Sequence, residues 1–486
     1  MFQRLNERAR SCSRRWQKED IRLRSVLLLP LALFVAVTAR LFISEAAFDL
    51  TGLAAAGVLT LFSGSLLAKA PSEYWKAAVR GASSELTGTV VLILIASGIF
   101  SAMMKASGVA DGLVFLGGML HLTGHAFTVF VLLASSLMAA ATGSSIGTLL
   151  AAMPIFFPAG VALGADPAML AGAVLSGAIF GDNLAPVSDV TVISSVTQRF
   201  RDGTPADIAG VVRTRLPYAM TALAVSMPVY AFMGASRPVS EAALSGDASA
   251  LLMLVPVAVL IAVAVRTRDV LMAISAGTVT GTATGLLIGR LSFATIFAAD
   301  DGRLSGFLIS GISNVSPIIL LCVTLFAFTG IVREAGVPDM MAKALEAGSA
   351  GRPSALRTEL FLSAATLVVT TLFAAVTSAS VALVGSLTDD IGRASNVHPY
   401  RRSHILSGLA NSLPVLMPFS AFVLITMAAV SGLEGAAAVT PFTLMTAAFY
   451  PIALFLVFGF MVLTGTGRMM ETPEPEAAEA KTATAL

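Results

Sequence analysis

The stretch from Leu175 to Gln198, LSGAIFGDNLAPVSDVTVISSVTQ, places Asp182 and Asp189 inside an otherwise apolar segment. An aspartate at the centre of a membrane helix costs about 2.5–3.5 kcal/mol on insertion scales. Gly181 and Pro186 interrupt the helical pattern, which frees carbonyl groups and helix ends to face a ligand. The segment therefore predicts a broken helix that carries a polar site at membrane depth.

The composition around this segment is that of a membrane protein. Of the 486 residues, 56% are hydrophobic and only 12% are charged, whereas soluble domains carry about 25% charged residues. Long uncharged runs occur at Leu86–Met104, Ala248–Val265 and Phe442–Leu463. Long uninterrupted runs favour spanning helices over the short alternating strands of a barrel. We expect about ten full crossings, by the length of the apolar runs.

Both ends of the chain are predicted to be cytoplasmic. Residues 1–25 form a basic segment ahead of an apolar run that begins at Val26, and basic residues favour the cytoplasmic side. Residues 468–486 are rich in Glu, Ala, Pro and Thr, a composition typical of a disordered tail. Because Lys and Arg gather at membrane edges, we expect a multi-pass inner (plasma) membrane protein that binds no nucleic acid.

A weak internal repeat recurs at an offset of about 230 residues. The sequence IASGIFSAMMKASGVAD at Ile95–Asp111 is answered by VTLFAFTGIVREAGVPD at Val323–Asp339. The motif Leu-Ser-Gly recurs in the same order, at Leu175 and at Leu406. We predict a first repeat at residues 26–235, an external linker at 236–248 and a second repeat at 249–467.

Basic loops indicate that the two repeats have opposite orientation. Lys69, Lys76 and Arg80 place the loop before the third span inside, whereas its repeat partner ends at a basic loop. The segment Thr358–Arg393 has basic residues at both ends, so we interpret it as a re-entrant hairpin that turns at Thr377–Ser380. Its counterpart is expected to turn at Thr142–Ser145. The predicted fold is an all-α polytopic membrane protein with two inverted-topology repeats, re-entrant hairpins and broken helices.

The residues near the two aspartates suit a hard cation. Asn183, Ser188 and Thr191 add neutral oxygen atoms, the ligand type that suits Na⁺ better than a soft metal. The alternative is a cytoplasmic or interfacial loop with ordinary turn residues. If both carboxylates lie in one site, protons and Na⁺ would compete for it.

Two motifs resemble a known family. GDNLAPVSDVT at Gly181–Thr191 resembles the signature of NhaC-type sodium/proton antiporters, and TGSSIGT at Thr142–Thr148 resembles the first hairpin of that family. The resemblance implies exchange of Na⁺ for H⁺, or in some relatives of Na⁺ with an organic substrate. It also implies an ion site formed by these residues: Asp182, Asn183, Ser188 and Asp189, with Thr142, Ser144 and Ser145 opposite.

The second half departs from the family pattern because it lacks the matching acid. It reads SGLANSLPVLMP at Ser407–Pro418, with the neutral Asn411 in place of a carboxylate. This leaves room for a substrate other than a bare cation. The candidate polar ligands here are Thr377, Ser378, Ser380, Asn411 and Ser420. His398 and His404, near Arg401 and Arg402, are interpreted as cytoplasmic loop residues, and Asp389 and Asp390 as the solvated end of the second hairpin.

The sequence therefore predicts a secondary active transporter and no enzyme. The leading hypothesis is a Na⁺/H⁺ antiporter that works by alternating access. The alternative is a Na⁺- or H⁺-coupled carrier or exchanger of a small organic acid or amino acid. A channel fits an occluding site less well, and the spans contain no zinc motif or paired nucleophile and base. We expect no cofactor and no metal beyond transported Na⁺, and allow for a homodimer.

Overall fold

The structure is a computed structural model that describes residues 33, 36, 37, 40, 50–68, 70–235, 247–267, 269–300, 303–334, 336 and 354–471. The predicted basic segment 1–25, most of the first span, linker residues 236–246 and the tail from 472 lie outside the described residues. The chain forms two compact units, residues 1–91 with 316–345 and residues 92–315 with 346–486.

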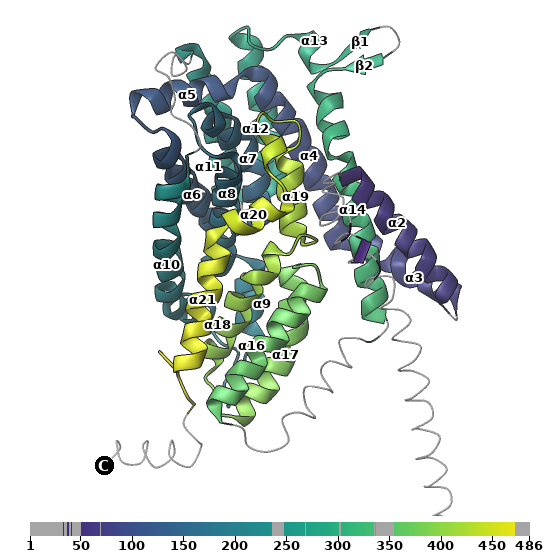
Figure 1. Ribbon diagram of the computed structural model, residues 1–486, viewed down its shortest axis with the longest axis vertical. Coiled ribbons are helices and arrows are strands. Elements are labelled where there is room, and N and C mark those ends of the chain that lie inside the picture. Colours follow the sequence, from purple (N-terminus) through teal and green to yellow (C-terminus); the bar gives the residue numbers. More distant parts are fainter. Residues whose placement is uncertain are drawn as a thin grey trace, which may run out of the picture. The chain divides into compact units, whose positions relative to one another are not determined.

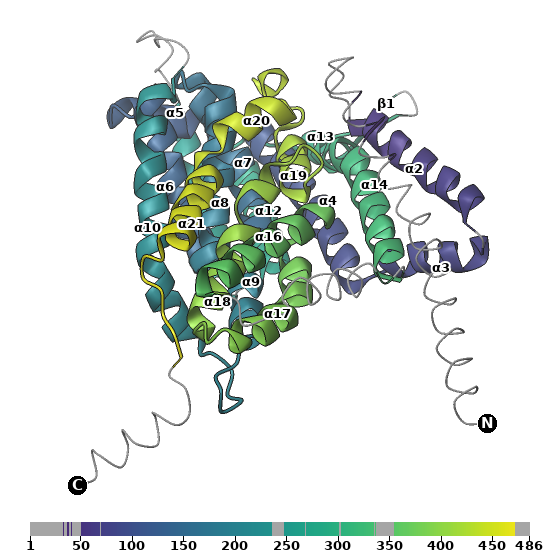
Figure 2. The same ribbon diagram turned by 60° about the horizontal axis from the view of Figure 1, so that its bottom comes forward.

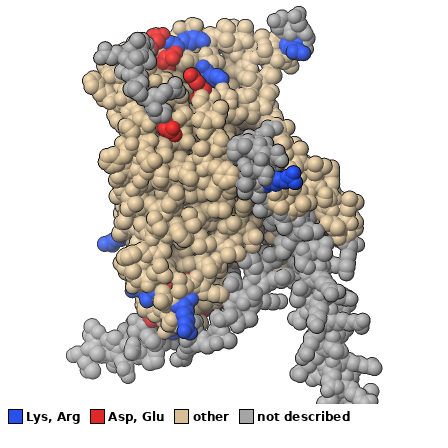
Figure 3. Space-filling model, in the orientation of Figure 1, with Lys and Arg blue, Asp and Glu red and all other residues tan. Residues whose placement is uncertain are grey.

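The prediction of an all-helical polytopic membrane protein is confirmed. Within the described residues, nine helices are long and apolar enough to cross a membrane, or up to eleven if each of two bent helix pairs counts as one span. On the face shown in Figure 3, most charged side chains of the larger unit lie near its upper and lower edges, with a broad uncharged band between them. One short hairpin of strands β1 (Ala298–Asp300) and β2 (Arg303–Ser305) accompanies the helices.

The smaller unit contains α2 (Leu50–Leu67), α3 (Pro71–Ala82) and the adjoining ends of α4 (Glu85–Ser107) and α14 (Phe307–Glu334). Tyr74 of α3 donates a hydrogen bond to the carbonyl of Leu61 in α2 at 3.0 Å. At Gly81 the backbone of α14 comes so close that an added Cβ would lie 2.1 Å from the carbonyl oxygen of Phe326. The basic stretch before the third span is thus a packed helix, where the sequence indicated a loop.

The larger unit holds the broken helices and both hairpins (Figures 1 and 2). In chain order, after α4, its elements are α5 (Val109–Met119), α6 (Gly124–Thr142), α7 (Ser145–Ala162), α8 (Pro167–Leu184), α9 (Asp189–Val196), α10 (Ile208–Met233), η2 (Ala248–Met253), α11 (Leu254–Thr267), α12 (Val270–Leu287), α13 (Phe293–Ile296), the two strands, the start of α14, α16 (Ala355–Leu372), α17 (Thr377–Ala394), α18 (Pro399–Ala410), η3 (Leu413–Leu416), α19 (Ala421–Val430), η4 (Ala436–Ala438), α20 (Pro441–Ala447) and α21 (Phe449–Thr464).

Helices α6 and α7 form the first hairpin. They are joined only by Gly143 and Ser144, and the backbone NH of Gly124 at the start of α6 donates to the carbonyl of Leu163 just after α7 at 2.8 Å. Both arms therefore begin and end on the same side. The turn is where the sequence predicts it.

Helices α16 and α17 form the second hairpin. Thr358 near the start of α16 donates to the hydroxyl of Ser395 just after α17 at 2.7 Å. The turn lies at residues 373–376, so Thr377–Ser380 form the first turn of α17, slightly beyond the predicted turn.

The two hairpins open toward opposite ends of the larger unit, and α10 demonstrates this because it runs between those ends. Its last turn is followed by Gly234, whose carbonyl accepts from the hydroxyl of Thr128 near the open end of the first hairpin at 2.8 Å. Its first turn follows Asp207, which accepts a hydrogen bond from Tyr400 beyond the open end of the second hairpin. At 1.5 Å per residue, the 26 residues of α10 span about 39 Å. The inverted arrangement of the hairpins follows (Figure 1).

Two of the breaks in the spanning segments lie next to prolines. Pro186 has no NH to donate to the carbonyl of Asp182, which instead accepts a hydrogen bond from Thr191 at 3.2 Å. Pro451 likewise leaves the carbonyl of Ala447 to the hydroxyl of Tyr230 at 2.7 Å. The apolar run at 442–463 is therefore not one straight span but the pair α20 and α21, bent by 52°.

Candidate functional site

Asp182 lies in the last turn of α8, beside the break that separates α8 from α9. The residue is only 6% exposed. The hydroxyl of Ser188 donates to Asp182 Oδ1 at 2.9 Å, and the side chain of Ser145 also forms a hydrogen bond with the carboxyl group. The carboxyl group is thus held by hydroxyls from the break and from the first hairpin.

The tip of the first hairpin packs directly on this break. Gly143 adopts φ +69°, and a Cβ added there would lie 2.5 Å from Val187 Cγ2 and 3.1 Å from the backbone nitrogen of Ser188. Only glycine fits both the backbone angle and the contact. The predicted meeting of the hairpin with the Asp182 segment is therefore present in the structure.

The hydroxyls of Thr142 and Ser144 stabilise the hairpin tip itself. Ser144 caps α7 by accepting from the backbone NH of Gly147 at 3.1 Å. The hydroxyls of Thr142 and Thr148 lie 3.3 Å apart. Of the three predicted hairpin ligands, Ser145 is therefore the one that contacts Asp182.

Asp189 is set apart from Asp182. It is the first residue of α9 and its side chain is exposed. It acts on the Asp182 carboxyl group electrostatically, without a shared hydrogen bond. A carboxylate in the first turn of a helix is also favoured by the helix dipole. The two predicted aspartates thus differ in surroundings, one enclosed and one exposed.

Asn183 links the two halves of the chain. It is fully buried, its Nδ2 donates to the hydroxyl of Tyr450 in α21 at 3.2 Å, and its Oδ1 accepts from Ser407 of α18 at 3.4 Å. The side-chain amide therefore faces the second half.

The second half repeats the geometry of the first around a neutral centre. The backbone NH of Ala421, which begins α19, donates to the carbonyl of Ala374 in the second hairpin tip at 2.8 Å. Asn411 follows the last residue of α18, is fully buried, and neither its Nδ2 nor its Oδ1 has a hydrogen-bond partner among the described residues. A buried unpaired amide costs about 1–3 kcal/mol, so its presence here calls for an explanation beyond packing.

The remaining second-half candidates are engaged locally. The hydroxyl of Ser380 donates to the carbonyl of Val376 at 2.9 Å, and that of Ser420 to the carbonyl of Val415 at 2.6 Å. Thr377 is buried and Ser378 is partly buried in the first turn of α17. The structure therefore brings these residues to the second break and hairpin tip without showing a shared ligand.

Arg215 is the residue that the sequence reasoning missed. It lies on α10, is fully buried, and donates hydrogen bonds to Asn183 and Ser407 around the break. Its neighbour Arg213 is exposed. Residues two apart on a helix face different directions, so the pair is one surface arginine and one core arginine. A serine pair four residues apart on α18, Ser403 and Ser407, is the sequence signal that could have located its partners.

The interpretation of the His398–Arg402 region as a cytoplasmic loop is wrong for most of it. Pro399 begins α18, and Arg401, Arg402 and His404 are all fully buried in that helix. The hydroxyl of Thr214 and His404 Nε2 lie 3.0 Å apart. These polar residues are buried because α18 packs among α9, α16 and α17. This helix packing cannot be recognised from a sequence segment that is rich in charged residues.

Asp389 is likewise buried rather than solvated. Arg402 donates to Asp389 Oδ1 at 2.6 Å, and Asp389 also accepts from the backbone NH of Arg199 at 2.7 Å. Asp390, by contrast, is exposed, as the sequence interpretation requires.

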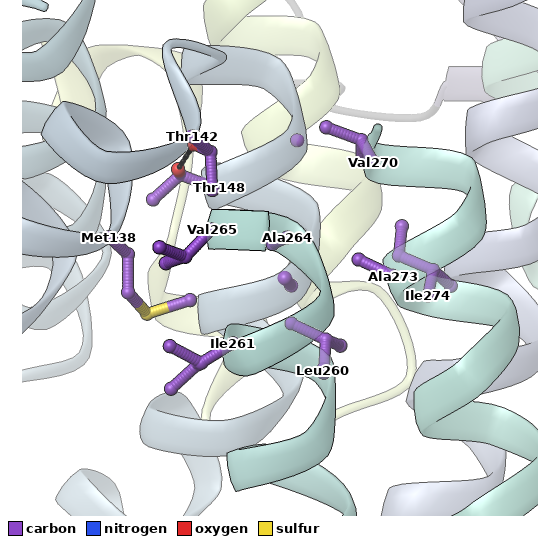
Figure 4. A pocket seen from close by; sticks show the side chains of 12 residues that line it. Met138, Thr142, Thr148, Leu260, Ile261, Ala264, Val265, Val270, Ala273 and Ile274 are labelled. Atoms are coloured by element: carbon purple, nitrogen blue, oxygen red, sulfur yellow. Dashed lines mark hydrogen bonds between the residues drawn. The ribbon is translucent and has the colours of Figure 1, made fainter. Parts of the chain in front are cut away.

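An apolar pocket lies beside the first hairpin tip. It has an empty volume of about 350 Å³ and is bounded by α6 and α7 on one side and by α11 and α12 on the other. Figure 4 shows Met138, Ile261 and Val265 pointing into it, with the Thr142 and Thr148 hydroxyls at its edge. It offers no set of oxygen ligands, so it is no cation site.

The first half of the chain matches a known protein family. Residues 21–235 match the model of the Na+/H+ antiporter family. The predicted resemblance is confirmed. The matched region contains the whole first hairpin and the helix break at Asp182, so the similarity to the family includes the candidate ion site of the first half.

Three relatives extend the comparison. The chain is 33% identical over 158 residues to the malate-2H(+)/Na(+)-lactate antiporter of Bacillus subtilis, which is 32% of either chain. It is 40% identical over 104 residues to the Na(+)/H(+) antiporter NhaC of Alkalihalophilus pseudofirmus, 21% of this chain and 22% of the other. It is 23% identical over 324 residues to an uncharacterized Na(+)/H(+) antiporter of Haemophilus influenzae, 60% of this chain and 67% of the other. The alignments with the first two relatives thus span less than a third of their lengths.

Solved structures resemble the chain only distantly. The YdaH transporter of Alcanivorax borkumensis is 13% identical with a TM-score of 0.39 and matches 83% of this chain and 90% of its own. MtrF of Neisseria gonorrhoeae is 12% identical with a TM-score of 0.38 and matches 91% of this chain and 97% of its own.

Proposed function

We propose that this protein is a secondary active Na⁺/H⁺ antiporter in which Na⁺ and H⁺ compete for Asp182. The observation that carries the proposal is the charge at the first break. The described residues contain three buried carboxylates, and Asp182 is the one without an arginine partner, because Glu359 pairs with Arg401 and Asp389 with Arg402. A buried carboxylate without a counter-charge needs either a proton or a cation.

The surroundings of Asp182 support a hard cation. Ser188 and Ser145 bring neutral hydroxyl oxygens to the carboxyl group, and oxygen ligands suit such ions. When Asp182 is protonated, the same site is neutral and holds no Na⁺. One carboxyl group then exchanges one cation for one proton, with the hairpins opening the site alternately to either side.

The setting of this activity is part of the proposal. We place the protein in the plasma membrane with both termini in the cytoplasm, on the basic N-terminal segment and the positive-inside rule. A homodimer is compatible with this proposal. On this proposal the uncharged band on the face shown in Figure 3 lies against lipid.

A second candidate function is a Na⁺- or H⁺-coupled exchanger of a small organic acid or amino acid. The unpartnered amide of Asn411 favours it, because a neutral donor and acceptor suits the polar group of an organic substrate better than a bare cation. The Bacillus subtilis relative, named a malate-2H(+)/Na(+)-lactate antiporter, supports the same direction.

Proteoliposomes test both candidates. With a preformed pH gradient and a pH-sensitive dye inside, Na⁺ alone should collapse the gradient if the protein is an antiporter. If collapse requires Na⁺ together with a small hydroxy acid or amino acid, the second candidate replaces the first.

The Asp182→Asn variant locates the activity. It keeps the shape of the side chain and removes the exchangeable charge, so exchange should fall by more than about 100-fold, in line with the cost of removing an essential acid–base group. Asp166→Asn is the matched control, because Asp166 caps the other end of α8 through the backbone NH of Met169. Undiminished exchange in Asp182→Asn would refute the proposed site.

A further inference from the structure

Arg215 is a buried cation with no acidic partner. It is fully enclosed on α10, and no carboxylate of the described residues lies within ion-pair distance. Among the described residues, its two terminal nitrogens bind neutral oxygens only, and its Nε has no hydrogen-bond partner. Burying a charge without a counter-charge is costly. The hydrogen bonds that Arg215 makes to neutral oxygens indicate what the buried charge is for.

The contacts of Arg215 divide between the two halves of the chain. Nη1 donates to the carbonyl of Asn183 at 2.8 Å and lies 3.4 Å from the hydroxyl of Thr191. It also donates to Ser407 Oγ at 2.8 Å, while Nη2 donates to Ser403 Oγ at 2.9 Å. One guanidinium thus fastens the α8–α9 break of the first half to α18 of the second.

The first-half contacts lead directly to Asp182. Asn183 follows Asp182 in the chain, and its carbonyl belongs to the last turn of α8, where backbone carbonyls lack helical partners. The hydroxyl of Thr191 accepts from Arg215 and donates to the carbonyl of Asp182 at 3.2 Å. Arg215 therefore holds the backbone just after the Asp182 side chain, directly at the carbonyl of Asn183 and through Thr191 at the carbonyl of Asp182 itself. Its positive charge complements the negative end of the α8 dipole.

We propose that Arg215 is a positioning residue that sets the cation affinity of the Asp182 site by holding Asn183 and Thr191 in place. This inference rests on the proposed antiport at Asp182. Arg215 does not contact the transported ion. It acts through the residues that fix the carboxyl group and the neighbouring oxygens.

A lysine cannot take over this role in full. The guanidinium presents five donors in a rigid fork, which lets Nη1 and Nη2 reach separate oxygens on three helices, whereas an ammonium is a single point of charge. Arg215→Lys therefore keeps the charge and loses the simultaneous grip. Arg213→Lys is the matched control, because Arg213 lies on the same helix with its side chain exposed.

The experiment measures Na⁺ affinity separately from turnover. In proteoliposomes normalised to folded protein, Arg215→Lys should raise the apparent KM for Na⁺ about tenfold and leave the maximal rate within about twofold. Radioactive Na⁺ binding in detergent should weaken by the same factor. Arg213→Lys should change neither. If Arg215→Lys lowers only the amount of folded protein, with KM and Na⁺ binding unchanged, the residue is purely structural and the inference fails.

A coupling test uses the hydroxyl through which Arg215 acts. Thr191→Val should raise the KM by itself, and the double variant with Arg215→Lys should raise it by less than the product of the two single effects, because both changes break one chain of contacts. Independent, multiplicative effects would contradict the inference. Should Arg215→Lys not fold, Ser407→Ala tests the same grip, with an expected KM increase of about threefold.

The outcomes also separate this inference from the proposed function. Absence of Na⁺-driven proton movement and of Na⁺ binding in the wild-type protein would refute antiport itself. Normal antiport and binding in the wild type with an unchanged KM in all three variants would refute only the role of Arg215.

Discussion

In the larger unit, the buried carboxylates lie at the helix break in the first half of the chain and at the hairpin in the second half. In the first half, the hairpin α6–α7 contains no Lys, Arg, Asp or Glu, and the charge lies at the break, on Asp182. In the second half, the break around Asn411 is neutral, and charge lies near the open end of the hairpin α16–α17, on Glu359 and Asp389.

The partners of these carboxylates show what the difference means. Glu359 is fully buried and accepts from Arg401 at 3.0 and 3.1 Å and from Arg468 at 3.1 and 3.0 Å. All of its charge is used inside the protein. Among the described residues, Asp182 accepts from hydroxyls and pairs with no arginine, so under the proposed function its charge is available to a transported cation. The buried carboxylates of the second half are instead paired inside the protein.

The hairpin tips differ as well. The first turns through Gly143, where a side chain has no room. The second turns through Ala374 and Ala375, both alanines with positive φ, at 50° and 59°. The first tip is therefore shaped by its contact with the break, and the second is held in place despite a backbone conformation that alanine disfavours.

The largest expected effect comes from removing the fastening charge. Glu359→Gln leaves Arg401 buried without a full counter-charge, and breaking a buried pair typically costs about 3–5 kcal/mol. Equilibrium unfolding in detergent measures the loss. Glu334→Gln is the control, because Glu334 pairs with Arg80 at 3.1 Å with both side chains about half exposed, where a pair contributes about 0–1 kcal/mol. Equal effects of the two variants would show that burial adds nothing to the contribution of the Glu359 pair to stability.

The next effect concerns the first tip. Gly143→Ala places a Cβ 2.5 Å from Val187 Cγ2 at φ +69°, and the backbone strain alone costs about 1–2 kcal/mol. We expect a loss of about 2 kcal/mol and about tenfold slower exchange, because Ser188 must shift away from Asp182. Gly459→Ala is the control, since nothing lies within 4 Å of its added Cβ. Wild-type exchange in Gly143→Ala would mean that the tip does not position the site.

The positions of the breaks and of the first turn could be predicted from sequence because they are local. Pro186 lacks the NH that a helix needs, and Gly143 permits the turn, so the residues themselves fix these features. The membrane character follows from composition alone. The bend at Ala448 has a comparable local signal in Pro451, but the prediction missed it because the run at 442–463 is long and apolar enough for one straight span. The carbonyl released by Pro451 is satisfied by Tyr230, a residue far away in the chain.

The buried cations could not be predicted because their burial is decided by packing. Arg213 and Arg215 look alike in sequence, near the start of a span where arginines usually reach the interface. Only the position of α18 against α10 makes one of them a core residue with serine partners. The same holds for Arg401 and Arg402, which read as loop residues and prove to be buried anchors for the two arms of the second hairpin.

A smaller effect is expected at Asn411, in the neutral break of the second half. Asn411→Leu replaces an unpartnered buried amide by an apolar group of similar size, so stability should rise by about 1 kcal/mol. If Asn411 is a ligand, transport should fall at least about fivefold at the same time, the combination expected when a functional group is kept at a cost in stability. Unfolding and flux assays on one preparation measure both. Higher stability with full transport would show that the second centre has no ligand role.

The smallest effect is expected at the second tip. Glycine at position 374 or 375 relieves about 1–2 kcal/mol of left-handed strain but loses about 0.5–1 kcal/mol in backbone entropy, so Ala374→Gly and Ala375→Gly should each stabilise the protein by about 0.5–1 kcal/mol. Ala379→Gly, within α17, should destabilise it by a similar amount. Exchange should stay within about twofold in all three variants. If the tip variants raise the stability and Ala379→Gly lowers it, with exchange unchanged, the second hairpin tip carries backbone strain that exchange does not require. Loss of exchange in Ala374→Gly would instead show that exchange depends on the strained turn and its hydrogen bond to Ala421, the kind of role that we predict for Gly143 in the first half.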